Sequence, residues 1–96
     1  MKKKDVEYEQ LGRCLKGLAH DLRLKIIYFL ADGEKTVSEI EQYTGRSQSN
    51  ISQHLILMRD KNILISRKDA NQIYYSLKDA RILSIIRQLC EILANK

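Results

Sequence analysis

The chain has 96 residues, with 17 Lys and Arg against 12 Asp and Glu and a formal charge of +5. This length fits one domain, so we expect residues 1–96 to fold as a single unit whose modest core favours pairing with a second copy. No apolar run approaches the roughly 20 residues that span a bilayer, and the Met1–Asp5 start lacks the apolar stretch of a signal peptide. These features exclude an integral membrane protein and favour a cytoplasmic one. The basic surplus favours a polyanionic partner, either nucleic acid or an anionic membrane surface.

Helical spacing of apolar residues predicts two helices in the first third of the chain. The first extends from about Asp5 to Leu18, and a flexible basic arm at residues 1–4 precedes it. The second extends from Asp21 to about Ala31 and ends at Asp32-Gly33. It is expected to turn four apolar side chains inward, namely Leu24, Ile27, Tyr28 and Leu30.

Two short helices joined by a tight turn are predicted in the middle of the chain. Thr36-Val37-Ser38-Glu39 has the form of a capping box, in which the Thr36 hydroxyl accepts from the Glu39 amide and the Glu39 carboxylate reaches back to Thr36. This helix runs to Tyr43 and closes at Thr44-Gly45, and Ser47 caps a second helix that runs to Asp60. The arrangement is the helix-turn-helix pattern.

A change to β-branched and aromatic residues predicts a β-hairpin after these helices. Its strands are Ile63–Lys68 and Gln72–Leu77, with a turn at Asp69-Ala70-Asn71. Asp79 then begins a last helix with an apolar face too broad for a small monomer to cover, formed by Ile82, Ile85, Ile86, Leu89 and Leu93. The predicted fold is therefore mainly α, a winged helix-turn-helix of five helices and a two-stranded wing.

The helix that Ser47 caps has a polar face suited to a DNA major groove. A periodicity of 100° per residue directs Ile51, Leu55 and Met58 inward, and small hydroxyls and amides outward. Such side chains clear the groove walls and bond base edges, and the amides at the helix start suit a phosphate. The alternative is an ordinary polar helix face. The expected DNA contacts are Arg46, Ser47, Gln48, Ser49, Asn50, Ser52, Gln53 and His54.

The predicted hairpin tip offers a second set of DNA contacts. Arg67, Lys68 and Asn71 lie at or beside the turn, where long side chains reach phosphates or the minor groove. Arg and Lys at a hairpin tip are also common as solubilising residues. The position of the hairpin directly after a helix-turn-helix favours the contact.

The order of elements and four sequence phrases resemble the ArsR/SmtB family of bacterial winged-helix repressors, over nearly the whole chain. The resemblance implies a homodimer that pairs through its first and last helices and sits on an imperfect inverted repeat of double-stranded DNA. It implies that the bound dimer represses by occluding a promoter and that an inducer relieves this repression. It also implies that four residues read the DNA, namely Gln48, Ser49, Ser52 and Gln53. Where the family often has proline, this chain has Asp21. The phrases are LAHDLRL at residues 18–24, VSEI at 37–40, SQSNISQHL at 47–55 and IYYSL at 73–77.

Proteins of this family differ mainly in the site with which they sense an inducer. A thiolate metal site in the third helix needs Cys-x-Cys where this chain has Val37-Ser38-Glu39, and a site on the last helix needs histidine, which residues 79–96 lack. His20 and His54 are expected in structural or DNA-facing roles. We therefore expect no metal ligands and no zinc, cobalt or nickel sensing.

Cys14 and Cys90 fall on the helices that the resemblance assigns to the dimer interface. Free cysteine is among the most buried residue types, so packing is one interpretation. The other is a thiol sensor, within or between protomers, that forms a reversible disulfide or polysulfide bridge or binds a soft metal such as arsenite. Two sulfurs leave a trigonal arsenite site incomplete. A persulfide-sensing branch of the family has cysteines at the positions of Tyr28 and Ala94 here, so sulfur sensing requires another geometry.

The sequence carries no catalytic constellation, since it has no paired carboxylates, Ser/His/Asp set, metal cluster or glycine-rich phosphate loop. We do not expect an enzyme. The expected function is a sequence-specific, dimeric DNA-binding repressor released by an inducer. The alternative is a winged-helix domain that binds DNA constitutively or serves protein interaction, with structural cysteines and no inducer site.

Overall fold

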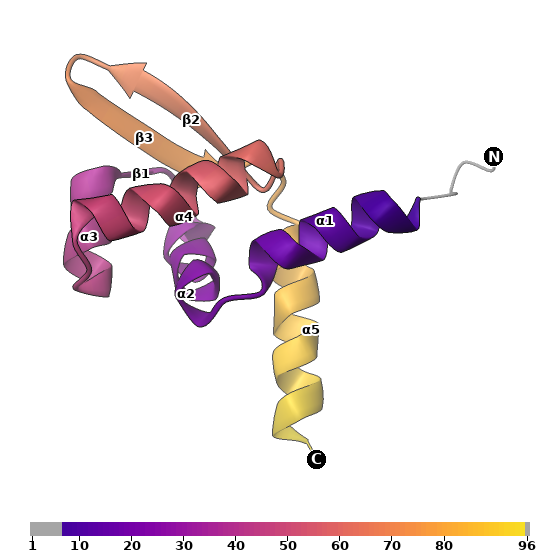
Figure 1. Ribbon diagram of the computed structural model, residues 1–96. Coiled ribbons are helices and arrows are strands. Elements are labelled where there is room, and N and C mark those ends of the chain that lie inside the picture. Colours follow the sequence, from indigo (N-terminus) through magenta and orange to yellow (C-terminus); the bar gives the residue numbers. More distant parts are fainter. Residues whose placement is uncertain (1–6, 96) are drawn as a thin grey trace.

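The computed structural model describes residues 7–95, and the basic arm expected at residues 1–4 lies outside this range. Within it, five α-helices and a small antiparallel sheet form the predicted winged helix-turn-helix (Figure 1). In chain order the elements are α1 (Tyr8–Leu18), α2 (Asp21–Phe29), the 3₁₀ turn η2 (Leu30–Asp32), β1 (Lys35–Thr36), α3 (Val37–Thr44), α4 (Gln48–Asp60), β2 (Leu64–Asp69), β3 (Gln72–Leu77) and α5 (Ile82–Ala94).

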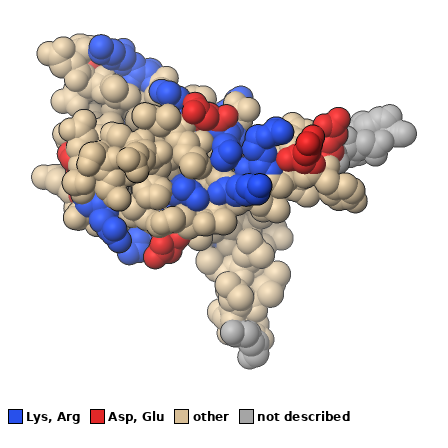
Figure 2. All heavy atoms as spheres, viewed as in Figure 1, with Lys and Arg blue, Asp and Glu red and all other residues tan. Residues whose placement is uncertain are grey.

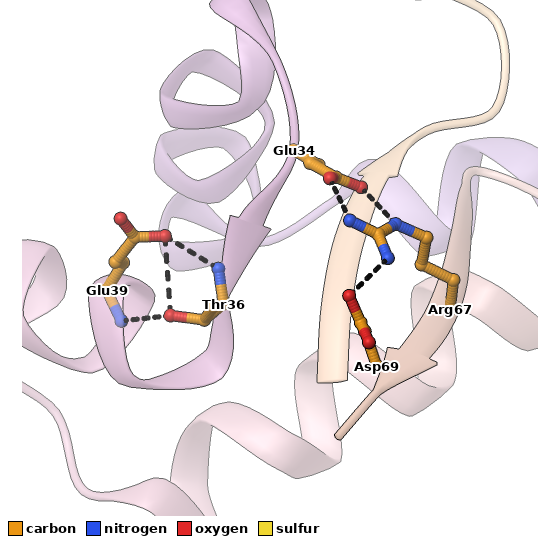
Figure 3. Close-up of polar contacts among 5 residues, drawn as sticks. All are labelled: Glu34, Thr36, Glu39, Arg67 and Asp69. Carbon is orange, nitrogen blue, oxygen red and sulfur yellow. Dashed lines mark hydrogen bonds and ion pairs between the residues drawn. The ribbon is translucent and has the colours of Figure 1, made fainter. Parts of the chain in front are cut away.

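The two helices of the helix-turn-helix are delimited by the expected caps. The Glu39 amide donates to the Thr36 hydroxyl at 3.1 Å, and the Thr36 amide donates to the Glu39 carboxylate at 2.8 Å (Figure 3). Gly45 ends α3 in the left-handed region, with φ of 71°. The Ser47 hydroxyl then accepts from the Asn50 amide at 3.3 Å and starts α4. The capping prediction is confirmed at both helices.

Three helix boundaries differ from the prediction. α1 begins at Tyr8 rather than at about Asp5, with Glu7 as its extended N-cap residue. α2 ends at Phe29 because the following residues tighten into η2. The last helix begins at Ile82 rather than Asp79. Residues 79–81 form a turn instead, in which the Asp79 carboxylate accepts from the Arg81 amide at 3.0 Å and the Asp79 carbonyl accepts from the Ile82 amide at 3.2 Å. The aspartate is therefore a turn residue ahead of the helix.

The wing belongs to a sheet of three strands, in the order β1-β3-β2, where the sequence predicted two. β1 pairs antiparallel with β3 and sets Lys35 opposite Tyr75 and Thr36 opposite Tyr74. A strand of two residues is too short to show an alternating pattern, which explains why sequence reasoning missed it. Its effect is to attach the start of α3 to the central strand of the sheet.

The core is formed mainly by α2, α3, α4 and the inner face of the sheet. Its largest fully buried side chains are Ile26, Ile27, Ile40, Ile51, Leu55, Met58 and Leu64. Tyr28, expected to point inward, is instead 37% exposed. The prediction was wrong there because α2 directs Leu22, Ile26 and Ile27 to the core, and Tyr28 falls beside them, on the exposed side of the helix.

The helices α1 and α5 extend away from this core, on the side opposite the wing tip (Figure 1). Two residues of α5, Leu83 and Ile86, are buried. Apolar side chains along both helices remain between 44% and 66% exposed, namely Leu11, Leu15, Ile85, Leu89, Ile92 and Leu93. The unfilled apolar face expected for the last helix is therefore present, and α1 adds to it. Among residues 7–95, no helix has the length and apolarity needed to traverse a bilayer.

Candidate DNA-binding surface

The helix α4 separates its apolar and polar residues onto two faces. Ile51, Leu55 and Met58 are fully buried in the core. On the other side, Gln48, Ser49 and Gln53 are exposed and Ser52 is half-buried. Burial of the apolar side fixes the rotation of the helix, so the hydroxyls and amides face away from the core. Ile56 also remains exposed near the end of α4, which confines the polar surface to its first turns.

The start of α4 presents hydrogen-bond donors. Arg46, Ser47 and Gln48 are exposed there. The first amides of a helix have no intrahelical partner, and here the cap residue Ser47 satisfies the Asn50 amide only. The amides of Gln48 and Ser49 are therefore directed out of the helix start, where the dipole favours an anion.

Asn50 and His54 lie at the inner edge of the polar surface. The His54 ring packs against the His20 ring with centroids 4.6 Å apart, and Arg23 donates from Nη1 to its Nδ1 at 3.3 Å. Burial, followed by the positive groups of His20, Arg23 and Arg46, lowers the pKa of His54 below its ordinary value. Because the Arg23 guanidinium can only donate, His54 Nδ1 accepts this hydrogen bond, which joins α4 to α2. The Asn50 Oδ1 atom is buried without a partner among residues 7–95.

The predicted wing residues separate onto different sides of the hairpin. In the β2–β3 register Arg67 lies opposite Tyr74 and Lys68 opposite Ile73, so the two basic side chains point to opposite faces of the sheet. Lys68 and Asn71 are exposed beside the tip.

Arg67 is held by Glu34, a residue that sequence reasoning missed. Its Nε donates to Glu34 Oε1 at 2.9 Å and its Nη2 to Oε2 at 2.5 Å, while Asp69 lies 3.6 Å from Nη1 (Figure 3). The guanidinium also lies 4.3 Å from the centroid of the Tyr74 ring. The Arg67 hydrogen bonds lower the pKa of Glu34. No local pattern reveals a pair separated by 33 residues, because the three-stranded sheet creates it.

The two cysteines have different surroundings and both are free thiols. Cys14, on α1, is half-buried beside Ile82 and Ile85 at the start of α5. Cys90, further along α5, is exposed. Partial burial and the neighbouring Cys90 thiol raise the pKa of the Tyr28 hydroxyl. No disulfide joins Cys90 to Cys14.

Charge is distributed around α4 in a way that suits a duplex. Figure 2 views the molecule from the side on which α4 lies in front. On this face uncharged residues cover α4, and Lys and Arg side chains lie around this uncharged area. Uncharged amides and hydroxyls suit base edges, whereas cations suit the phosphates on either side of a groove.

Comparisons with known proteins agree with this geometry. Residues 20–66 match the model of the bacterial regulatory protein arsR family. A biofilm growth-associated repressor from Xylella fastidiosa is 32% identical over all of this chain and 86% of its own length. The HTH-type transcriptional regulator YgaV from Escherichia coli is 39% identical, over 84% of this chain and 83% of its own.

A solved structure extends the similarity to three dimensions. The homodimeric winged helix-turn-helix DNA-binding domain from Mycobacterium bovis superposes with a TM-score of 0.83 at 26% identity, covering 95% of this chain and 87% of that one. The fold, the separated faces of α4 and these relatives support one conclusion: the chain belongs to the arsR family of bacterial regulatory proteins and is a DNA-binding regulator, not an enzyme.

Proposed function

We propose that the chain is a dimeric repressor that occupies an imperfect inverted repeat in double-stranded DNA, with α4 of each copy in a major groove. The observation that carries the proposal is the separation of faces on α4. Its apolar side is fully buried at Ile51, Leu55 and Met58, so the uncharged polar side is presented outward in one fixed rotation. A helix held in this way can place the same side chains against the same base edges at every encounter.

The contact residues divide by chemistry. Gln48, Ser49, Ser52 and Gln53 are proposed to read bases, because hydroxyls and amides both donate and accept hydrogen bonds. Arg46 and Ser47 are proposed to bind phosphate at the start of α4, and Lys68, Asn71 and Arg67 to contact the duplex from the wing. Asn50 and His54 complete the inner edge, where His54 also supports α4 through Arg23.

A second copy would cover the exposed apolar faces of α1 and α5. These faces carry six large side chains that the described part of one chain leaves exposed, which is unusual for a monomer of this size. Two copies related by a twofold axis place two α4 helices on one side of the assembly, as two half-sites of an inverted repeat require. The M. bovis domain, with its homodimeric fold, supports this arrangement.

Selection of bound duplexes from a random pool, followed by titration, tests the proposal. The selected operator should bind at least roughly 10³-fold more tightly than a scrambled duplex. Ser49→Ala and Gln53→Ala should each reduce discrimination against mutated operators by about 1–3 kcal/mol. Gln88→Ala, which removes an exposed amide from α5, is the matched control and should leave the preference unchanged.

The same titration distinguishes an inducible repressor from the alternative functions. A winged-helix domain used for protein interaction would bind operator and scrambled DNA with equal affinity, and Ser49→Ala and Gln53→Ala would then change nothing. A constitutive DNA-binding protein would retain the preference but would not release DNA under any thiol reagent.

Release by thiol chemistry at Cys14 and Cys90 is the inducer response that we propose. Both residues lie on the two helices that carry the exposed apolar faces, so modification there would act on the assembly rather than on α4. On a single chain Cys90 is exposed and so open to an oxidant, a polysulfide or arsenite. The double variant Cys14→Ser/Cys90→Ser should bind DNA as the unmodified protein does and ignore all three reagents. A response that persists in this variant would identify the cysteines as packing residues.

A further inference from the structure

A cluster of cations lies where α1 crosses the C-terminal end of α4. Arg13 and Lys16 of α1 and Lys61, directly after α4, line one shallow hollow of about 370 Å³. We call these three residues the junction patch. Lys and Arg side chains gather at this crossing, on the same face of the molecule as α4 (Figure 2). Neither the polar side of α4 nor the wing includes them.

The patch lies where α1 passes close to the segment that follows α4. A Cβ atom on Gly17 would lie 2.4 Å from Ile63 Cδ1 and 3.1 Å from Lys61 Cδ, so a larger residue at this position would displace these two side chains. The aliphatic stem of Lys61 therefore packs against α1. Lys61 lines the same hollow as Arg13 and Lys16, although it lies 45 positions after Lys16 in the sequence.

Hydrogen bonds fix the position of the patch relative to the polar face of α4. The Arg23 guanidinium donates from Nη2 to the Lys16 carbonyl at 3.2 Å and from Nη1 to His54 Nδ1 at 3.3 Å. One side chain of α2 therefore holds both the end of α1 and the middle of α4. The patch therefore keeps one position relative to the polar face of α4, and a ligand bound across α4 would always meet it at the same place.

The cations of the patch are not neutralised within the described chain. Glu9 lines the same hollow and Asp60 precedes Lys61. Even so, no carboxylate of residues 7–95 comes within 4.0 Å of a charged nitrogen of Arg13, Lys16 or Lys61. Like charges that share a hollow repel one another, and an anionic partner relieves that repulsion.

We propose that the junction patch binds backbone phosphates of the duplex that α4 reads. The inference rests on the proposed function, because it takes its partner from the groove contact of α4. In Figure 1 the tip of the wing and helix α1, which carries Arg13 and Lys16, extend in opposite directions from α4. Each copy then holds the duplex by phosphates on both sides of the groove. Such contacts add affinity without sequence preference, since phosphates are the same at every base pair.

Arg13→Gln/Lys16→Gln/Lys61→Gln tests the proposal, because glutamine removes the charge and keeps an aliphatic stem against Gly17. Dissociation constants for the selected operator and a scrambled duplex are measured from about 50 to 300 mM salt. Each lost phosphate contact should reduce the slope of log affinity against log salt by about 0.9. We expect a loss of about 10-fold or more for both duplexes at low salt, with their affinity ratio unchanged.

Two controls keep the outcomes separate. Lys25→Gln removes an exposed cation of α2 that does not line the hollow, and should leave the slope unchanged. If the triple variant unfolds, as circular dichroism would reveal, the single variant Lys16→Gln replaces it and should reduce the slope by about 0.9 per bound copy.

The failure of this inference can be distinguished from failure of the proposed function. An unchanged slope in the triple variant, with discrimination still lost in Gln53→Ala, would overturn the junction patch and leave α4 as the reader. A change in the operator preference of the triple variant would also overturn it, because phosphate contacts carry no sequence information. Equal binding of operator and scrambled DNA by the unmodified protein would overturn the proposed function as well.

Discussion

The core formed by α2, α3, α4 and the sheet differs sharply from the pair α1 and α5. In the first region seven large side chains are almost fully buried within one chain, although Ile56, Ile65 and Ile73 at its surface are between 42% and 48% exposed. In the second, α5 buries two residues and exposes most of its remaining apolar surface. The comparison indicates that one chain alone packs the core that positions α4. The exposed apolar faces of α1 and α5, in contrast, are those that we propose a second copy covers.

The largest expected effect comes from placing a charge on the outer helices. Leu89→Lys puts an ammonium on an apolar face that a second copy would bury, at a cost of several kcal/mol. We expect a monomer in analytical ultracentrifugation. A monomer contacts only one half-site of the operator. Without the second contact, which the dimer holds in place, operator affinity should fall by about 10²–10⁴-fold.

Ile65→Lys is the control for this prediction. Ile65 is 48% exposed, close to the 52% of Leu89, but it lies on β2 and outside the outer helices. It should leave the oligomeric state unchanged. A Leu89→Lys protein that still sediments as a dimer would contradict the assignment of α1 and α5 to the contact between the two copies.

Shortening a buried side chain of the core should lower the stability of the fold. Ile51 is fully buried on the inner side of α4, so Ile51→Ala should lower the free energy of unfolding by about 2–5 kcal/mol. Urea denaturation at fixed protein concentration measures the loss. Ile56→Ala, on the exposed side of the same helix, should change the stability by no more than about 0.5 kcal/mol. Similar losses in the two variants would show that α4 is not anchored as described.

The ion pair at the wing should have a smaller effect, on DNA binding rather than on folding. Glu34 occupies two donors of Arg67 and adds a negative charge beside the proposed DNA surface. Glu34→Gln should therefore increase operator affinity several-fold at low salt, as measured by fluorescence anisotropy. The gain should be smaller when the same change is made in an Arg67→Ala protein, because only the loss of the Glu34 charge then contributes. An equal gain there would mean that Arg67 is not released to the DNA.

The smallest expected effect is a change in the pH dependence of stability. The pKa of His54 is lower in the folded chain than its ordinary value of 6.5, because burial and neighbouring positive groups disfavour the protonated ring. Below about pH 6.5 the unfolded chain therefore takes up a proton at His54 that the folded chain does not, and stability falls. His54→Gln should flatten the fall in the free energy of unfolding between about pH 7.5 and 5.5. Parallel curves for the two proteins would contradict this account.

Much of the fold could be predicted from the sequence because its signals are local. Thr36 and Glu39 form a capping box within four residues, and the buried positions of α4 follow helical periodicity. The prediction failed where the signal was short or ambiguous. β1 has two residues, Tyr28 borders the buried side of α2, and Asp79 suits a turn as well as a helix start.

Residue spacing along single elements was enough to predict the order of the elements, the two faces of α4 and the excess of apolar surface on the last helix. Which charged groups meet depends instead on how distant segments of the chain pack together. The tertiary structure pairs Arg67 with Glu34, seats His54 between His20 and Arg23, and gathers Arg13, Lys16 and Lys61 into one hollow. These contacts join residues 31 or more positions apart, and no pattern within one element encodes such distances.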